Sequence, residues 1–170
     1  MKILITGICG FVGSNIAREL LVHFPQCDIM GIDNFSRSGS FLNQQALLSE
    51  GIEVFVGDIR MASDMESLPA VDWVIDAAAM ASVLSGVNTS SPRLLLEHNL
   101  QSTFNVLEYC RKHQAGLILI STSRVYSVDG LMSIPVTSSD HAFVLDQASP
   151  LPVGVSPNGI NTTFSTQSPI

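Results

Sequence analysis

Three glycines near the start of the chain are spaced like a phosphate-binding loop. Gly7, Gly10 and Gly13 follow a short apolar run and open a segment with helical periodicity. In such a loop the first glycine permits a tight turn out of a strand, the second lets the backbone approach a pyrophosphate, and the third lets the helix pack closely. The start of the helix would then present free N–H groups and a partial positive charge to the phosphates.

An acidic side chain after the second apolar run strengthens this interpretation. Asp33 stands at the end of that run, 20 residues after Gly13. A carboxylate at this place accepts both hydroxyls of an adenosine ribose and repels a 2′-phosphate, so the sequence favours NAD over NADP. Arg37 lies close enough in sequence to soften that preference. The alternative is that the glycines are structural and Asp33 is a surface residue.

Two further strand ends carry weaker signals. Asp58 and Ile59 follow the third apolar run, where the carboxylate can accept the adenine amino group and Ile59 can pack on the ring. An alternative role for Asp58 is the N-cap of the next helix. The fourth run ends at Asp76, and three alanines, Ala77 to Ala79, follow it. Small residues at this edge of a sheet leave room for a ligand, although they are equally expected wherever a helix packs closely.

Apolar runs alternate with helical periodicity along the first three quarters of the chain, which is typical of β-α-β units. The pattern predicts an α/β fold with a doubly wound parallel sheet of the Rossmann type. Predicted strands are Lys2–Thr6, Asp28–Ile32, Glu53–Val56, Trp73–Asp76 and Leu117–Ser121, and predicted helices are Phe11–His23, Ser40–Ser49 and Pro92–His113. In the last helix, Leu96, Leu100, Phe104 and Leu107 have the spacing of a buried face.

The chain divides by composition into two parts. Residues 1–126 have the pattern of one dinucleotide-binding domain. Residues 127–170 are rich in Pro, Gly and Ser and have no periodicity, so we expect an irregular segment there. Such a long irregular stretch is unusual in a compact domain and is either a mobile tail or a substrate-side loop.

Composition narrows the classes of function. A net charge of −7 and a pI near 4.8 argue against binding to nucleic acid or to anionic membranes. No apolar run approaches the roughly 20 residues that cross a bilayer. The three cysteines are widely spaced, which indicates neither disulfides nor a zinc site and fits a reducing cytoplasm. The four histidines have no metal-binding spacing, so no metal is expected.

Five strings together resemble one family. They are Thr6-Gly7-x-x-Gly10-Phe11-x-Gly13, Asp33-Asn34-Phe35-Ser36-Arg37, Gly57-Asp58-Ile59-Arg60, Asn99 with Thr103-Phe104-Asn105-Val106-Leu107, and Ser121-Thr122-Ser123-Arg124-Val125-Tyr126. Each string alone is a weak signal, but the five strings in this order are specific to one family. The chain resembles the extended short-chain dehydrogenases/reductases, in particular the NAD-dependent epimerases and dehydratases of nucleotide sugars. Within these it is most similar to CDP-paratose (tyvelose) 2-epimerases.

The resemblance implies a role for each matching position. Thr122 corresponds to the catalytic Ser/Thr that hydrogen-bonds the reacting hydroxyl, and Asn99 would lie near the nicotinamide. The backbone amides of Phe11 and Val12 would contact the pyrophosphate, and Asn34 and Ser36 would lie beside the ribose. The cofactor-binding set is therefore Gly7, Gly10, Phe11, Val12, Gly13, Asp33, Asn34, Ser36, Arg37, Asp58, Ile59, Ala77, Ala78, Ala79 and Asn99.

Three departures from the family pattern limit what the chain can do. Asp76 stands where His is usual, and Ser127 replaces the Gly that usually follows Val-Tyr. The catalytic Tyr-x-x-x-Lys is absent, because Tyr109 and Tyr126 are the only tyrosines and neither is followed by Lys four residues later. We therefore expect a truncated fold that binds NAD without turnover, with the missing motif within a few residues after Ile170.

The same resemblance suggests a nucleotide-activated sugar as substrate of the longer form and a possible homodimer, with the predicted 92–113 helix in the interface. Two other functions stay open. A nucleotide-sugar dehydratase usually carries Asp-Glu after the catalytic Thr, where Ser123-Arg124 stand here. A non-catalytic dinucleotide sensor would keep the glycine loop and lack the Tyr-Lys pair.

Overall fold

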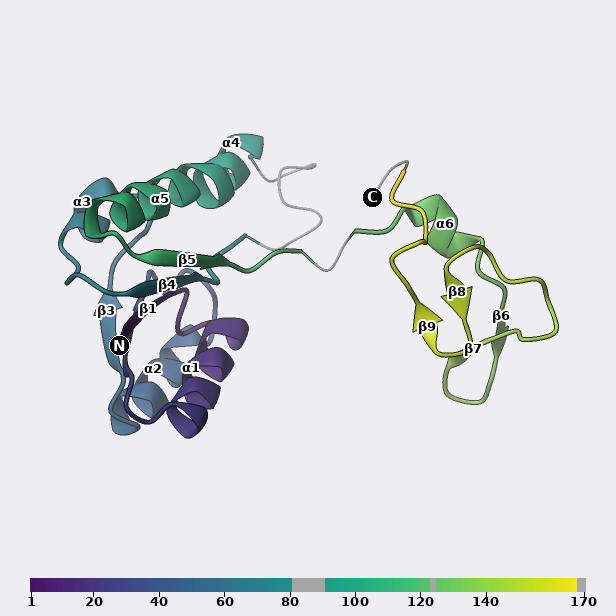
Figure 1. Ribbon diagram of the computed structural model, residues 1–170, viewed down its shortest axis with the longest axis horizontal. Coiled ribbons are helices and arrows are strands. Elements are labelled where there is room, and N and C mark those ends of the chain that lie inside the picture. Colours follow the sequence, from purple (N-terminus) through teal and green to yellow (C-terminus); the bar gives the residue numbers. More distant parts are fainter. Residues whose placement is uncertain (81–90, 123–124, 168–170) are drawn as a thin grey trace. The chain divides into compact units, whose positions relative to one another are not determined.

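The computed structural model describes residues 1–80, 91–122 and 125–167. The chain forms two compact units, Met1–Ile120 and Ser121–Ile170 (Figure 1). The division after Ile120 falls earlier than the one predicted after Tyr126, because the chain leaves the sheet soon after its fifth strand. Among the described residues, no helix combines the length and the apolar character needed to span a membrane.

A five-stranded parallel sheet forms the centre of the first unit. Its strands are β1 (Lys2–Thr6), β2 (Asp28–Asp33), β3 (Glu53–Val56), β4 (Trp73–Asp76) and β5 (Gly116–Leu119). They lie in the order β3-β2-β1-β4-β5, and every neighbouring pair is parallel. The strand order reverses between β1 and β4, and such a switch point is where open α/β sheets bind ligands. The predicted Rossmann-type sheet is confirmed.

Helices cover both faces of this sheet (Figure 1). The helices α1 (Phe11–His23) and α2 (Ser40–Ser49) lie on one face, and α3 (Ala62–Glu66) and α5 (Ser102–His113) lie on the other. Successive strand residues point to opposite faces, so Ile5 packs into the core under α1 and α2 while Leu4 packs into the core under α5. Both faces of β1 are thus buried, as its uninterrupted apolar sequence requires.

The long helix after β4 differs from the prediction in its middle. It runs as α4 (Pro92–Leu96), the π-helical segment η1 (Glu97–Gln101) and α5. The predicted buried face is wrong, because Leu96, Leu100, Phe104 and Leu107 are 45% to 58% exposed. The helix buries a smaller and more polar face, made of Ser102, Val106, Tyr109 and Cys110. Hydrophobic spacing marks the most apolar face of a helix, which here is not the face that packs on the sheet.

The second unit contains short regular elements in the segment predicted to be irregular. They are α6 (Val128–Met132), the antiparallel pair β6 (Val136–Ser138) and β7 (Phe143–Leu145), and the pair β8 (Val155–Ser156) and β9 (Gly159–Ile160). Phe164 is buried and meets the ring of Tyr126 edge-on, with ring centroids 5.4 Å apart. Ser127, which replaces the usual Gly, caps α6 by accepting the Gly130 N–H.

Candidate functional site

A cavity of about 280 Å³ opens at the carboxyl ends of β1 to β4. It brings together the four segments that the sequence singled out, and every residue of the predicted cofactor set except Asn99 lines it. Those residues are Gly7, Gly10, Phe11, Val12, Gly13, Asp33, Asn34, Ser36, Arg37, Asp58, Ile59, Ala77, Ala78 and Ala79. Ile32, Ser40, Gly57, Arg60 and His98 also line the cavity, although the sequence had given them no role.

The glycine loop leaves no space for side chains at its first and last glycines. Gly7 has a φ of +62°, and a Cβ there would lie 2.9 Å from the Cα of Ala78. A Cβ on Gly13 would lie 2.4 Å from the carbonyl oxygen of Gly7. The loop therefore packs against both the end of β4 and the start of α1, and its backbone borders the cavity directly. Such a wall of backbone suits a diphosphate.

The start of α1 faces this cavity without a side-chain cap. Its N-cap residue is Gly10, in extended conformation, which has no side chain that could accept from the first-turn amides. Phe11 and Val12, at the first two helical positions, are exposed. A helix of 13 residues that begins this way has uncapped N–H groups and a partial positive charge for an anion.

Asp33 is buried at the end of β2 and connects that strand to the glycine loop. Its Oδ2 accepts the Cys9 N–H (2.9 Å) and its Oδ1 accepts the Phe35 N–H (2.8 Å). A carboxylate has about four acceptor positions, so each oxygen keeps capacity for one more donor. Two hydroxyls of a ribose match that capacity.

Asp58 is held by Arg60, a residue of the same Gly57-Asp58-Ile59-Arg60 string for which the sequence predicted no role. The guanidinium Nη2 lies 2.5 Å from Oδ2, and the side chain of Asn34 donates to the same oxygen (3.1 Å). This ion pair holds the pKa of Asp58 far below its usual range. The N-cap alternative is wrong, since α3 begins at Ala62 after the N-cap residue Met61. Asp58 and Asn34 instead join the ends of β3 and β2.

Thr6 and Asp76 meet at the switch point between β1 and β4. The Thr6 hydroxyl donates to Asp76 Oδ1 (2.5 Å) and accepts the N–H groups of Ala77 (3.2 Å) and Ala78 (3.1 Å). Asp76 is only 3% exposed, and burial raises its pKa. The pair fixes the course of the alanine segment along the cavity.

The side chain of Asn99 binds backbone beside the cavity. It accepts the Met80 N–H (2.8 Å) and donates to the Met80 carbonyl (3.3 Å). Asn99 belongs to the π-helical segment η1, and π turns are frequent at functional sites. The preceding residue, His98, lines the cavity, and its Nδ1 lies 2.8 Å from the Leu94 carbonyl. The same nitrogen also lies 3.4 Å from the Nη1 atom of Arg60, so His98 connects the long helix to the Asp58–Arg60 pair.

Thr122 lies in the second unit, outside the unit that contains the cavity. The two residues after it, Ser123 and Arg124, lie outside the described residues. The two tyrosines have partners of their own. Tyr109, on α5, is buried, donates to the Pro69 carbonyl and has a pKa raised by burial to about 12, while Tyr126 packs against Phe164.

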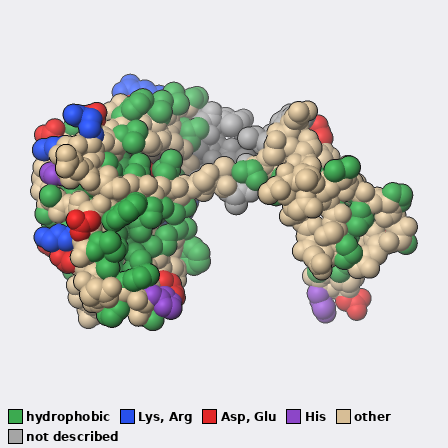
Figure 2. Space-filling view, in the orientation of Figure 1, with side chains coloured by type: hydrophobic (Ala, Val, Ile, Leu, Met, Phe, Trp, Pro, Cys, Tyr) green, Lys and Arg blue, Asp and Glu red, His purple; other side chains and the backbone are tan. Residues whose placement is uncertain are grey.

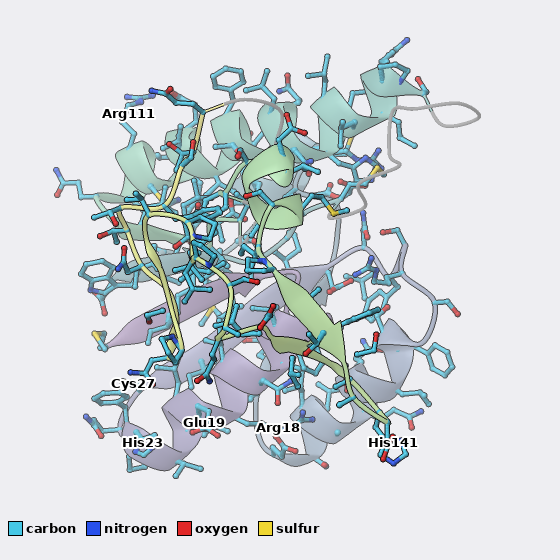
Figure 3. All side chains as sticks on the ribbon, turned by 90° about the vertical axis from the view of Figure 1, so that its right-hand side faces the viewer. Arg18, Glu19, His23, Cys27, Arg111 and His141 are labelled. Atoms are coloured by element: carbon cyan, nitrogen blue, oxygen red, sulfur yellow. The ribbon has the colours of Figure 1, made fainter. Side chains whose placement is uncertain are left out.

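The described histidines lie on separate elements. Figure 3 labels His23, at the end of α1 and one turn from Glu19, and His141, between β6 and β7. Over residues 1–80, 91–122 and 125–167, no group of three or more His, Cys, Asp and Glu side chains is arranged to hold a metal ion.

Comparison with protein families agrees with this geometry. The model of the NAD dependent epimerase/dehydratase family matches residues 3–149. The chain belongs to this family. Among its relatives in the NAD dependent epimerase/dehydratase family, CDP-paratose 2-epimerase of Salmonella typhi is 37% identical over 131 residues, which are 74% of this chain and 38% of that enzyme. A dTDP-glucose 4,6-dehydratase of Mycobacterium tuberculosis is 31% identical over 127 residues, which are 74% of this chain and 38% of that enzyme.

A solved relative supports the same assignment. The UDP-glucuronic acid 4-epimerase of Bacillus cereus, a mutant crystallised with NAD and UDP-4-deoxy-4-fluoro-glucuronic acid, aligns with a TM-score of 0.66 and 28% identity. The alignment covers 85% of this chain and 46% of that enzyme. The chain thus spans about two fifths of the length of the curated relatives it matches and corresponds to their NAD-binding N-terminal portion.

Proposed function

We propose that this chain binds NAD in the cavity at the switch point and forms the cofactor-binding part of a nucleotide-sugar epimerase. One observation carries the proposal: four segments far apart in sequence, each with residue types suited to a dinucleotide, line a single cavity. The glycine loop and the start of α1 would hold the pyrophosphate. Asp33 would hold the adenosine ribose, and its negative charge favours NAD over NADP.

The adenine end of the site is bounded by Ile59 and the Asp58–Arg60 ion pair. Ile59 is buried against the core and offers an apolar surface for the ring. Both oxygens of Asp58 already accept hydrogen bonds from Arg60. An adenine amino group would therefore share the Asp58 carboxylate with the guanidinium, and Arg60 would orient that carboxylate.

When bound, NAD would take a hydride from the sugar and later return it. The residues of this chain would hold the cofactor, and Thr122 would orient a sugar hydroxyl. A threonine hydroxyl does not ionise near neutral pH, so a base must come from elsewhere. Losing a positioned base costs roughly 10²–10⁴ in rate. We therefore propose that residues 1–170 alone bind NAD without epimerising a sugar nucleotide.

We propose that a second copy of the protein covers the exposed apolar side of the long helix. Leu96, Leu100, Phe104 and Leu107 form this stripe, and Figure 2 shows hydrophobic side chains gathered over α5 and β5 in the first unit. A stripe of large apolar side chains at helical spacing is typical of a helix-packing interface.

The three cysteines are buried and unpaired, which supports a reducing compartment such as the cytoplasm.

Titration calorimetry of the full 170-residue chain with NAD and NADP tests the cofactor assignment. We expect saturable binding of NAD and weaker binding of NADP. The same protein is then incubated with CDP-paratose or UDP-glucose, and the sugar is analysed for inversion. Failure to bind NAD would overturn the cofactor assignment, whereas epimerisation by this chain alone would overturn the need for an external base.

A further inference from the structure

The carbonyl and the amide of Cys9 both bind side chains from outside the glycine loop. The Cys9 N–H donates to Asp33, and the Cys9 carbonyl accepts the side-chain N–H of Asn43 at 2.9 Å. Asn43 lies on α2, 34 residues after Cys9, and does not line the cavity. No sequence motif described above includes this asparagine.

We infer that Asn43 is a positioning residue for the pyrophosphate loop, an inference that rests on the proposed NAD site. The loop reverses direction between Gly7 and Gly10, where the Gly10 N–H donates to the Gly7 carbonyl at 2.9 Å. The Cys9–Gly10 peptide contains both the carbonyl that Asn43 binds and the N–H that closes this turn. Holding the carbonyl therefore fixes the plane of that peptide at the entrance to α1.

The surroundings of Asn43 make this contact specific. Cys9 is fully buried between the loop and the core under α1 and α2, so its carbonyl depends on a protein donor. A buried carbonyl without a donor is costly, and loops relieve that cost by moving toward water. With Asn43 in place, the loop is fixed from β2 through Asp33 and from α2 through Asn43.

Asn43→Ala in the full 170-residue chain tests the inference. We expect NAD and ADP-ribose to bind about threefold to tenfold more weakly, the effect of losing one hydrogen bond. Adenosine, which lacks the pyrophosphate, should bind within twofold of its wild-type affinity. Gln45→Ala is the matched control, since it removes an exposed amide from the same helix, and it should leave all three affinities unchanged.

Two further measurements separate positioning from general stability. Asn43→Asp keeps the shape of the side chain but removes the N–H donor, so it should weaken NAD at least as much as Asn43→Ala. Hydrogen exchange of the peptide covering residues 7–13 should be faster in both Asn43 variants, while exchange in β4 stays unchanged.

The outcomes are distinct. If the wild type binds NAD and Asn43→Ala binds it as tightly as Gln45→Ala does, the inference is wrong and the proposed function stands. The inference would also be overturned if Asn43→Ala weakened the binding of adenosine as much as that of NAD. It would likewise be overturned if hydrogen exchange in residues 7–13 were as slow in the Asn43 variants as in the wild type. If the wild type binds no NAD, the proposed function itself fails.

Discussion

Replacing Asp33 by Ala should weaken both the NAD site and the fold, and the structure gives the size of each effect. The variant leaves the Cys9 N–H without its acceptor in a fully buried position. An unsatisfied buried amide costs about 1–3 kcal/mol. For a unit of 120 residues, this corresponds to a fall in Tm of about 4–12 °C.

The loss of binding should be at least as large as the loss of stability. Two ribose hydroxyls donating to a carboxylate contribute about 1.5 kcal/mol each at the lower end for charged groups. Their loss should weaken NAD about 100-fold. NADP should be affected much less, because removing the carboxylate also removes its repulsion of the 2′-phosphate, so the preference for NAD should shrink by at least about tenfold.

The assay is calorimetric titration with both dinucleotides, combined with thermal unfolding of the free protein. Asp28→Ala is the matched control, since Asp28 is exposed at the opposite end of the same strand and has the same charge. Asp33→Asn keeps one acceptor oxygen, so its Tm should lie between the Tm of the wild type and that of Asp33→Ala. Unchanged affinity for both dinucleotides in Asp33→Ala would refute the role assigned to this carboxylate.

Three further variants test other parts of the structure. Gly13→Ala places a Cβ 2.4 Å from the Gly7 carbonyl oxygen. It should therefore destabilise the fold by about 1–3 kcal/mol and abolish detectable NAD binding. An unchanged Tm would contradict the close packing of this glycine. Burial raises the pKa of Asp76, so the folded protein binds a proton more readily than the unfolded chain and stability falls as pH rises above about 4. Urea unfolding followed from pH 4 upward should show wild type losing stability relative to Asp76→Asn until the folded-state pKa is passed, by no more than about 1.4 kcal/mol per pH unit, and parallel curves would argue against an ionising Asp76. The double variant with Leu100→Glu and Phe104→Glu should associate less than the wild type as concentration rises, measured by light scattering, while its NAD affinity stays unchanged. Association equal to that of the wild type would show that the apolar stripe is not an interface.

Much of the first unit was predictable because its signals are local. The strands β1, β3 and β4 and the helices α1 and α2 begin and end at the predicted residues. Buried parallel strands leave uninterrupted apolar runs, and a strand that ends in a glycine loop marks both the turn and the start of the helix. The lining of the cavity followed from the strand ends, since parallel strands bring their carboxyl ends to one edge.

The features that were missed depend on tertiary contacts. The face of α5 that packs on the sheet is smaller and more polar than its exposed face, and hydrophobic spacing alone cannot separate a core from an interface. Asn43 acts through Cys9, 34 residues earlier, so no local pattern marks it. Arg60 pairs with Asp58 only two residues away, inside the Gly57-Asp58-Ile59-Arg60 string, so its local signal was available. The β8–β9 hairpin carries a local signal, because Ser156-Pro157-Asn158-Gly159 is a turn sequence, but the Pro, Gly and Ser content around it predicts irregular chain.

The π-helical segment η1 makes the helix after β4 sensitive to its length as well as to its composition. A π turn holds one residue more than an α turn. The wider turn absorbs that residue, so deleting one residue within Glu97–Gln101 would restore a regular α-helix and leave Leu96 and Phe104 on the same side of it. What would be lost is the wide turn that contains Asn99, whose amide binds the backbone of Met80 beside the cavity. One surplus residue thus shapes the inner wall of the cavity, and a change in chain length here would alter that wall while sparing the outer stripe.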